Sequence, residues 1–341
     1  MTMQQALQAT IEKMVQPGKG ILAADESLPT IAKRFAPIGV ESSEENRRAW
    51  RALLFTAPGI EDDISGVIEF AETLTQTADD GTPLPEVLAR RGIVPGIKVD
   101  KGKGPLARSP GDLITYGLDG LAERLQQYKQ QGARFAKWRE VYPIGTHNPS
   151  SLGISANAEM LARYAAVCQE QGIVPIVEPE VLMDGDHSLA RCAEVTETVQ
   201  KEIFHALHRH HVTLEHMVLK PNMVLPGKDH PRQASAEEVA AATVRVLRRC
   251  VPAAVPSINF LSGGLSPEQA TVNLNAINAG FPLEPWLLSF SYGRALQQPV
   301  LQAWQGKAEN VSAAQQALLK RARLNGAAQR GEYQASMEEE S

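Results

Sequence analysis

The chain has 341 residues, 43% of them hydrophobic and 21% charged, with a formal net charge of -5 and a pI near 6.0. This composition is ordinary for a globular enzyme, and it excludes a global electrostatic attraction to nucleic acid or to acidic membranes. No stretch approaches the ~20 apolar residues that a membrane span needs. The three cysteines, Cys168, Cys192 and Cys250, are odd in number and far apart, so no disulfide framework is indicated and we expect a cytoplasmic protein.

Short apolar runs typical of buried strands alternate with longer helical patterns along the chain. Repeated strand-helix order demands parallel pairing, and eight such strands are the number that a (β/α)8 barrel needs. We therefore predict an α/β fold, a single (β/α)8 TIM barrel domain over residues 1–341, in preference to two smaller domains or a doubly wound sheet. The predicted strands are 20–24, 64–70, 93–99, 133–141, 173–181, 217–224, 257–261 and 286–290.

The predicted helices between these strands carry recognisable N-terminal signals. Three segments open with a serine that is followed three residues later by glutamate or glutamine, the pattern of a capping box. From Leu296 onward no further strand is indicated, so we expect extra helices at both ends of the barrel and a flexible tail at about residues 330–341. The three predicted boxes are Ser42 with Glu45, Ser235 with Glu238, and Ser266 with Gln269.

Charged or polar residues interrupt four of the predicted strands near their carboxyl ends, where a buried strand should be apolar. Each pair is spaced i, i+2, which puts both members on one face of a strand. A single such pair is most often an exposed strand end, but four in register predict a functional site at the C-terminal mouth of the barrel. The pairs are Lys98 with Asp100, Lys137 with Arg139, Glu178 with Glu180, and Lys220 with Asn222.

Lys220 lies in the apolar segment VLKP (218–221) and is the strongest candidate for a lysine that forms a Schiff base. Burial and nearby cations favour the neutral amine, which is the nucleophilic form. Forming an iminium also requires proton transfers, for which Glu178, Glu180 and Asp25 are suitable carboxyl groups. The alternatives are a lysine that extends to solvent from a strand end and an aspartate that caps a helix.

Two segments that contain glycine follow the last two predicted strands and indicate a phosphate site. Ser262, Gly263 and Gly264 follow the seventh, and residues 291–294, which include Ser291, Gly293 and Arg294, follow the eighth. Barrels often bind phosphate there through backbone amides and a helix N-terminus, and an arginine can add a bidentate contact. Read alone, Ser-Gly-Gly is usually a turn.

Five histidines, His205, His208, His210, His211 and His216, raise the question of a metal site. They cluster at the end of a predicted helix, and no acidic ligand stands at a recognisable spacing. We therefore expect a surface helix end, and neither a metal nor a cofactor.

Seven segments, in order over nearly the whole chain, resemble class I fructose-bisphosphate aldolase. The resemblance implies a metal-free barrel, usually a cytoplasmic homotetramer, that reversibly cleaves fructose 1,6-bisphosphate to dihydroxyacetone phosphate and glyceraldehyde 3-phosphate in glycolysis and gluconeogenesis. The segments are GKGILAADES (18–27), GIKVDKG (96–102), FAKWR (135–139), IVEPE (176–180), LKPNMV (219–224), FLSGG (260–264) and SFSYGRAL (289–296).

The same resemblance implies a role for each matching residue. Lys220 matches the Schiff-base lysine, Glu178 the acid/base of the carbinolamine steps, and Asp25 the carboxylate that handles the C4 hydroxyl. Lys137 and Glu180 match the supporting charge network. Ser262, Gly263 and Arg294 match one phosphate site, and Ser27, Lys33, Arg34 and Lys98 match the side that faces the other phosphate.

Two positions depart from the family pattern. Leu28 and Pro29 stand where the family often has Thr-Gly, which stiffens the segment near the second phosphate. Many members end in a tyrosine that reaches the active site, whereas the last tyrosine here is Tyr333. The group that assists enamine protonation, and the preference between fructose 1,6-bisphosphate and fructose 1-phosphate, therefore stay open.

Two other functions compete with an aldolase. A pyridoxal-phosphate enzyme would also use a lysine at a strand end and a phosphate cradle. A sugar-phosphate-binding scaffold without turnover is the non-enzymatic alternative, because a fold alone does not fix function.

Overall fold

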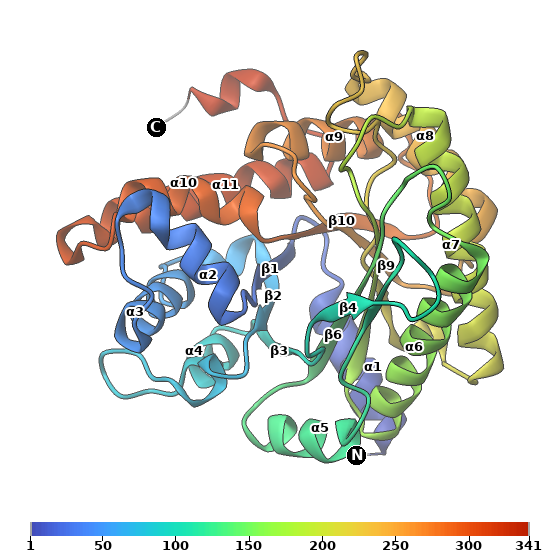
Figure 1. The fold of residues 1–341 in the computed structure, drawn as a ribbon. Helices are drawn as coiled ribbons and strands as arrows, with labels where there is room; N and C mark the ends of the chain where they lie inside the picture. Colours follow the sequence, from blue (N-terminus) through green and yellow to red (C-terminus); the bar gives the residue numbers. More distant parts are fainter. Residues whose placement is uncertain (1, 340–341) are drawn as a thin grey trace.

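The computed structural model describes residues 2–339 and contains a closed barrel of eight parallel strands (Figure 1). The predicted (β/α)8 barrel is confirmed, and around the barrel the strands follow the order β1-β10-β9-β8-β7-β6-β3-β2. The strands are β1 (Gly20–Ala24), β2 (Ile64–Glu69), β3 (Val94–Lys98), β6 (Phe135–Tyr142), β7 (Val174–Val181), β8 (Val218–Leu219), β9 (Ser257–Phe260) and β10 (Leu287–Tyr292).

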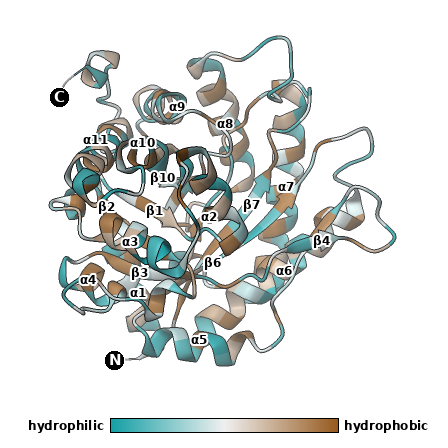
Figure 2. Cartoon of the chain, turned by 60° about the vertical axis from the view of Figure 1, so that its left-hand side comes forward, coloured by the Kyte–Doolittle hydropathy of each residue, from teal (hydrophilic) through white to brown (hydrophobic). Residues whose placement is uncertain are grey.

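Helices surround the barrel with their apolar residues turned inward and hydrophilic residues outward (Figure 2). The α-helices are α1 (Met3–Met14), α2 (Leu28–Phe35), α3 (Glu44–Phe55), α4 (Leu84–Arg90), α5 (Leu121–Gln130), α6 (Ser151–Glu170), α7 (Leu189–Arg209), α8 (Ala236–Cys250), α9 (Pro267–Gly280), α10 (Arg294–Trp304) and α11 (Val311–Gln329). Short 3-10 helices lie at Ala36–Ile38, Ile60–Asp62, Thr73–Thr75, Leu214–His216, Ala308–Asn310 and Ala335–Glu338. Within residues 2–339, no helix combines the length and apolar character needed to cross a membrane.

Two of the three predicted capping boxes are present, at Ser235 and Ser266. The third prediction is wrong by one residue. Ser43, rather than Ser42, caps α3, and its hydroxyl accepts a hydrogen bond from the Asn46 amide at 3.2 Å. Two adjacent serines can serve as the cap equally well by residue type, so the pattern leaves an ambiguity of one residue.

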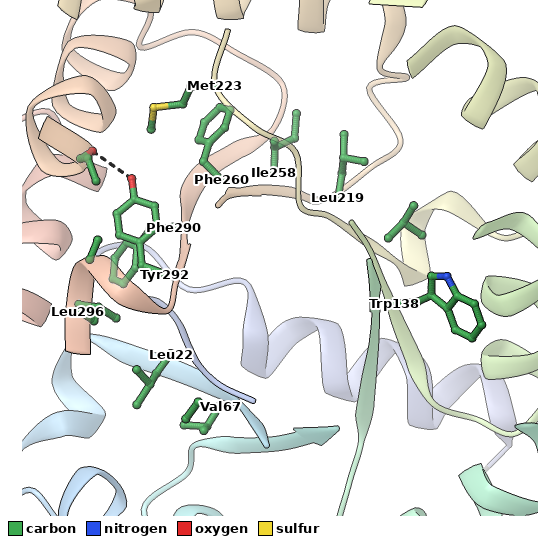
Figure 3. Close-up of a cluster of buried hydrophobic side chains, with 14 of the residues drawn as sticks. Leu22, Val67, Trp138, Leu219, Met223, Ile258, Phe260, Phe290, Tyr292 and Leu296 are labelled. Carbon is green, nitrogen blue, oxygen red and sulfur yellow. Dashed lines mark hydrogen bonds between the residues drawn. The ribbon is translucent and has the colours of Figure 1, made fainter. Parts of the chain in front are cut away.

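Strand residues that face outward form one large core with the helices. Figure 3 shows Leu22, Val67, Leu219 and Ile258 pointing into it from four strands of the barrel. The Tyr292 hydroxyl, also in this core, donates a hydrogen bond of 3.0 Å to the Ala270 carbonyl of α9. This satisfies its polar atom, as a buried hydroxyl requires.

Residues that face inward at the amino-terminal end of the strands form a second, separate core. Helix α1 contributes Leu7, Ile11 and Met14 to it. An added Cβ on Gly96 would lie 2.2 Å from the Phe135 ring, so this position has room only for glycine. The strand residues of this core are Ile21, Ala23, Ile68, Val94, Phe135, Val174, Ile176 and Val218.

Strand β8 is shorter than the predicted 217–224. The Lys220 amide still donates to the Val177 carbonyl at 2.8 Å, but Pro221 has no amide hydrogen to continue the ladder. Asn222 then accepts from the Val181 amide at 2.9 Å through its side chain. On the side that faces β7, a side-chain hydrogen bond therefore replaces backbone pairing, while on the other side the Pro221 carbonyl still accepts from the Leu261 amide at 3.0 Å.

A two-stranded antiparallel hairpin, β4 (Lys103–Pro105) and β5 (Leu113–Thr115), was not predicted. Each strand has three residues, too few for an alternating pattern to be detected. The hairpin forms a sheet separate from the barrel, and β5 contacts β6; Figure 1 labels β4 near that strand.

The last residues described pack against α11. Glu338 forms an ion pair of 2.6 Å with the buried Arg321 and accepts a hydrogen bond of 3.1 Å from the Tyr333 hydroxyl. Residues 340 and 341 lie outside the described part of the chain. The flexible tail at about 330–341 and the single domain over 1–341 therefore stay predictions.

Candidate active site

A cavity of about 1120 Å³ opens at the carboxyl ends of the barrel strands. All of the predicted site residues line it, although they come from seven of the eight strand ends and from α2. They are Asp25, Ser27, Lys33, Arg34, Lys98, Lys137, Arg139, Glu178, Glu180, Lys220, Ser262, Gly263, Gly264, Ser291, Gly293 and Arg294.

Four charged side chains form a chain of contacts at the floor of this cavity. Lys137 Nζ lies 2.7 Å from Asp25 Oδ2 and 3.1 Å from Glu178 Oε2. Lys220 Nζ lies 3.1 Å from the other carboxylate oxygen, Glu178 Oε1. Lys137, Glu178 and Lys220 are all at least 96% buried, so these contacts operate with little solvent screening.

Burial alone would raise the pKa of Asp25 and Glu178, but the neighbouring cations have the larger combined effect. Lys137, and to a smaller extent Lys220, lower the pKa values of both carboxyl groups below their ordinary values. Burial likewise opposes the charged form of Lys137, yet Asp25 and Glu178 hold its pKa above its ordinary value. Asp25, Glu178 and Lys137 are therefore charged at neutral pH, with Lys137 between the two carboxylates.

The alternation of β6 explains how one strand serves both the cavity and the core. Lys137 and Arg139 line the cavity, while Trp138 is fully buried on the opposite face and donates to Glu140 at 2.8 Å. Burial raises the pKa of the Glu140 carboxyl to about 8. Period-2 geometry thus separates the cavity charges from the helix-facing core.

Two further ion pairs surround this floor. Arg139 of β6 pairs with Glu180 of β7, and Lys98 Nζ lies 2.6 Å from Asp100 Oδ1 just after β3. Asn222, predicted with these charged pairs, does not line the cavity. Its side chain instead braces the ends of β7 and β8, as described above.

At the ends of β9 and β10 the backbone is shaped for an anion. Gly263 and Gly264 have φ values of +46° and +116°, a region that favours glycine and lets backbone amides turn toward the cavity. Gly293 directly precedes α10, and Arg294 is the first residue of that helix. Within residues 2–339, Arg294 has no carboxylate partner, so its charge can meet a ligand.

On the β1 side, Ser27 occupies the N-cap position of α2 without a capping hydrogen bond from its side chain, and its hydroxyl lies 3.0 Å from that of Thr30. Leu28 and Pro29 form the first turn of this helix, where proline is favoured. Arg34 is held by the buried Glu26, which also pairs with Arg51 at 2.5 Å.

The sequence prediction missed several residues of the cavity. Lys103 reaches it from the unpredicted hairpin, and Asp184 and Lys228 form an exposed ion pair of 2.5 Å at its rim. Glu26 is within the quoted motif GKGILAADES, and its acidic side chain next to Asp25 was the available signal. No sequence signal distinguished Lys103.

The clustered histidines lie away from this cavity, at the end of α7 and beyond it. His210 Nε2 lies 2.7 Å from Glu159 Oε1, and His216 Nε2 lies 3.2 Å from Gln8 Oε1. In the described part of the chain, no group of three or more histidines, cysteines and acidic residues is arranged to hold a metal ion.

The chain is similar to known proteins over nearly its whole length. A family model described as fructose-bisphosphate aldolase class-I matches residues 6–341. A fructose-bisphosphate aldolase of Drosophila melanogaster is 58% identical over 98% of this chain and 92% of its own length. The cytosolic fructose-bisphosphate aldolase 5 of Arabidopsis thaliana is 57% identical over 95% and 90%.

A solved structure gives the same result for the fold. Fructose-bisphosphate aldolase from Plasmodium falciparum, crystallised with TRAP and a small-molecule inhibitor, superimposes with a TM-score of 0.96. It is 50% identical and covers 98% of this chain and 96% of its own. The chain therefore belongs to the class I fructose-bisphosphate aldolase family.

Proposed function

We propose that the chain reversibly cleaves fructose 1,6-bisphosphate to dihydroxyacetone phosphate and glyceraldehyde 3-phosphate through a Schiff base on Lys220, in glycolysis and gluconeogenesis. The observation that carries this proposal is a buried lysine amine 3.1 Å from a buried carboxylate, at the floor of a cavity lined with cations. Family membership favours this function over the pyridoxal-phosphate and scaffold alternatives.

Lys220 attacks the C2 carbonyl of the substrate, and Glu178 is the proton carrier beside it. Because neighbouring cations keep Glu178 ionised, it can accept the proton that the Lys220 ammonium must lose. It then protonates the carbinolamine hydroxyl, which departs as water and leaves the iminium. The iminium is the electron sink for the next step.

Asp25 is the base for carbon–carbon cleavage. It removes the proton of the C4 hydroxyl as the C3–C4 bond breaks, and the bond's electrons pass into the iminium to form an enamine. Lys137, 2.7 Å from Asp25, offsets the negative charges of Asp25 and Glu178, which would otherwise repel each other. Protonation of the enamine and hydrolysis of the iminium release dihydroxyacetone phosphate.

The two phosphates lie on opposite sides of this floor. One binds the amides of residues 262–264 and the guanidinium of Arg294, where the glycine backbone and the start of α10 favour an anion. The other is served by Lys98 and Arg139, with Ser27, Lys33 and Arg34 along the β1 side. The protein acts in the cytoplasm as a homotetramer, as class I members usually do.

The decisive test is to trap the intermediate. We would incubate the protein with dihydroxyacetone phosphate and borohydride in the presence of a chelator, and then locate the reduced adduct by mass spectrometry. We expect an adduct on Lys220 in the wild type, and neither adduct nor turnover in Lys220→Met. An adduct on another lysine, or undiminished turnover in Lys220→Met, would overturn the assignment.

A further inference from the structure

The cations that line the cavity fall into two groups. Nine lysines and arginines line it, and six of them pair with a carboxylate: Arg34, Lys98, Lys137, Arg139, Lys220 and Lys228. Within residues 2–339, the other three have no ion pair, and these are Lys33, Lys103 and Arg294. An unpaired cation in a cavity that binds a dianion is the one whose charge is available to the ligand.

The backbone of Lys103 is anchored indirectly, through the residue opposite it on the short hairpin. It pairs across the hairpin with Thr115. The Thr115 hydroxyl donates to the Arg139 carbonyl at 2.9 Å, and the Thr115 amide donates to Glu140 Oε2 at 3.2 Å. The residue opposite Lys103 is thus fixed to β6, the strand that carries Arg139.

The position of β6 in the barrel decides which end of the substrate Lys103 can meet. In the closed strand order, β9 and β10 lie opposite β6 and β3. A phosphate held by Ser262 and Arg294 therefore directs the other end of an extended sugar bisphosphate toward β3 and β6. Lys98 and Arg139 already have carboxylate partners on that wall, and Lys103 does not.

The electrostatic surroundings of Lys103 favour an added anion. Partial burial, followed by the Arg139 guanidinium, lowers the pKa of Lys103, while Glu180 and Asp184 act in the opposite direction. A phosphate next to Lys103 would offset the repulsion from Arg139 and stabilise the ammonium.

We propose that Lys103 is a specificity-determining residue that contacts the second phosphate and makes the site favour a sugar bisphosphate over a sugar monophosphate. The inference rests on the proposed aldolase function and adds a residue on the β4–β5 hairpin to its second phosphate site. We expect its contribution to be confined to substrates that carry that phosphate, because within residues 2–339 no ion pair joins Lys103 to Lys220 or Glu178.

The test compares kcat/KM for fructose 1,6-bisphosphate with kcat/KM for fructose 1-phosphate, which lacks the second phosphate. In Lys103→Met we expect the ratio to fall by about fivefold, the scale of one partly exposed ion pair, through the bisphosphate value alone. Lys103→Arg keeps the charge and should keep the ratio. The matched control is Lys101→Met, because Lys101 is exposed on the same segment but does not line the cavity.

Added salt provides a second readout. Salt should lower the wild-type ratio of the two kcat/KM values toward the ratio of Lys103→Met, because the attraction between Lys103 and the second phosphate acts near solvent and is screened. An unchanged ratio in Lys103→Met, or an equal loss on both substrates, would overturn the inference while the Lys220 adduct still formed. Failure of the aldolase proposal would look different, since the wild type would then form no adduct and cleave neither sugar.

Discussion

The two ends of the barrel are built from the same strands but filled with opposite kinds of side chain. At the amino-terminal end, the inward residues are apolar and pack on Ile11 and its neighbours in α1. At the carboxyl end, the inward residues include Lys137, Glu178 and Lys220, which are buried and charged. On β6 the change occurs within two residues, from Phe135 to Lys137.

The amino-terminal end of the barrel therefore contributes mainly to stability, and the carboxyl end carries the reactive groups. Burying a large apolar side chain contributes roughly 1.5–3 kcal/mol, whereas a buried charge costs free energy unless it is paired. The apolar end therefore supports a charged end that contributes little stability of its own. Each prediction below changes one end and measures both stability and turnover.

The largest effect is expected from Lys137→Met at the charged end. Removing the cation leaves Asp25 and Glu178 buried with only Lys220 to offset their charges. We expect the free energy of unfolding to fall by ~3–5 kcal/mol and turnover to fall by roughly 100-fold or more. Denaturant unfolding at pH 7 and steady-state cleavage measure the two effects.

The pH dependence of that loss identifies its cause. Asp25 and Glu178 have lowered pKa values, so the stability they provide is present above their ordinary values of 3.8 and 4.5 and is lost in acid. Lys137 has a raised pKa, so its contribution persists up to its ordinary value of 10.5 and is lost above its folded value. The difference between wild type and variant should therefore narrow as the pH falls below 4.5. A constant difference would assign the loss to packing.

The barrel strands and most of the charged site could be predicted from local patterns in the sequence. Apolar runs bounded by glycine and proline located all eight barrel strands, and i, i+2 spacing brought Lys137, Arg139, Glu178 and Glu180 to one mouth. Both signals are local and periodic, so they can be detected in the sequence alone. The aldolase resemblance then added Lys33 and Arg34, which no periodic pattern indicates.

What could not be predicted depends on contacts between distant segments. Lys103 joins the site because Thr115 bonds to β6, and neither three-residue strand has a pattern of its own. The i, i+2 spacing groups Asn222 with the charged pairs. However, β8 ends before Pro221, and the Asn222 side chain accepts a hydrogen bond from the Val181 amide. Tertiary hydrogen bonds decided both positions.

A smaller effect, confined to stability, is expected from Ile11→Ala at the apolar end. Ile11 is 5% exposed and packs in the second core, so its truncation leaves a cavity and should cost ~2–4 kcal/mol. Turnover at 25 °C should stay within about twofold, because no cavity-lining residue belongs to α1. Thermal unfolding and steady-state kinetics give the two values. A large loss of turnover in the folded variant would show that the two ends are coupled.

The smallest effect is expected from Lys228→Met at the rim of the charged end. Lys228 lines the cavity, but it is paired with Asp184, and their side chains are 55% and 68% exposed, so water screens both charges. We expect kcat/KM for fructose 1,6-bisphosphate to change by less than about twofold, and the melting temperature to be unaffected. Asp184→Asn should match it if the two charges only offset each other. A clear loss in Lys228→Met, together with normal activity in Asp184→Asn, would instead mean that Lys228 contacts the substrate, and the charged end would then extend outward to this rim.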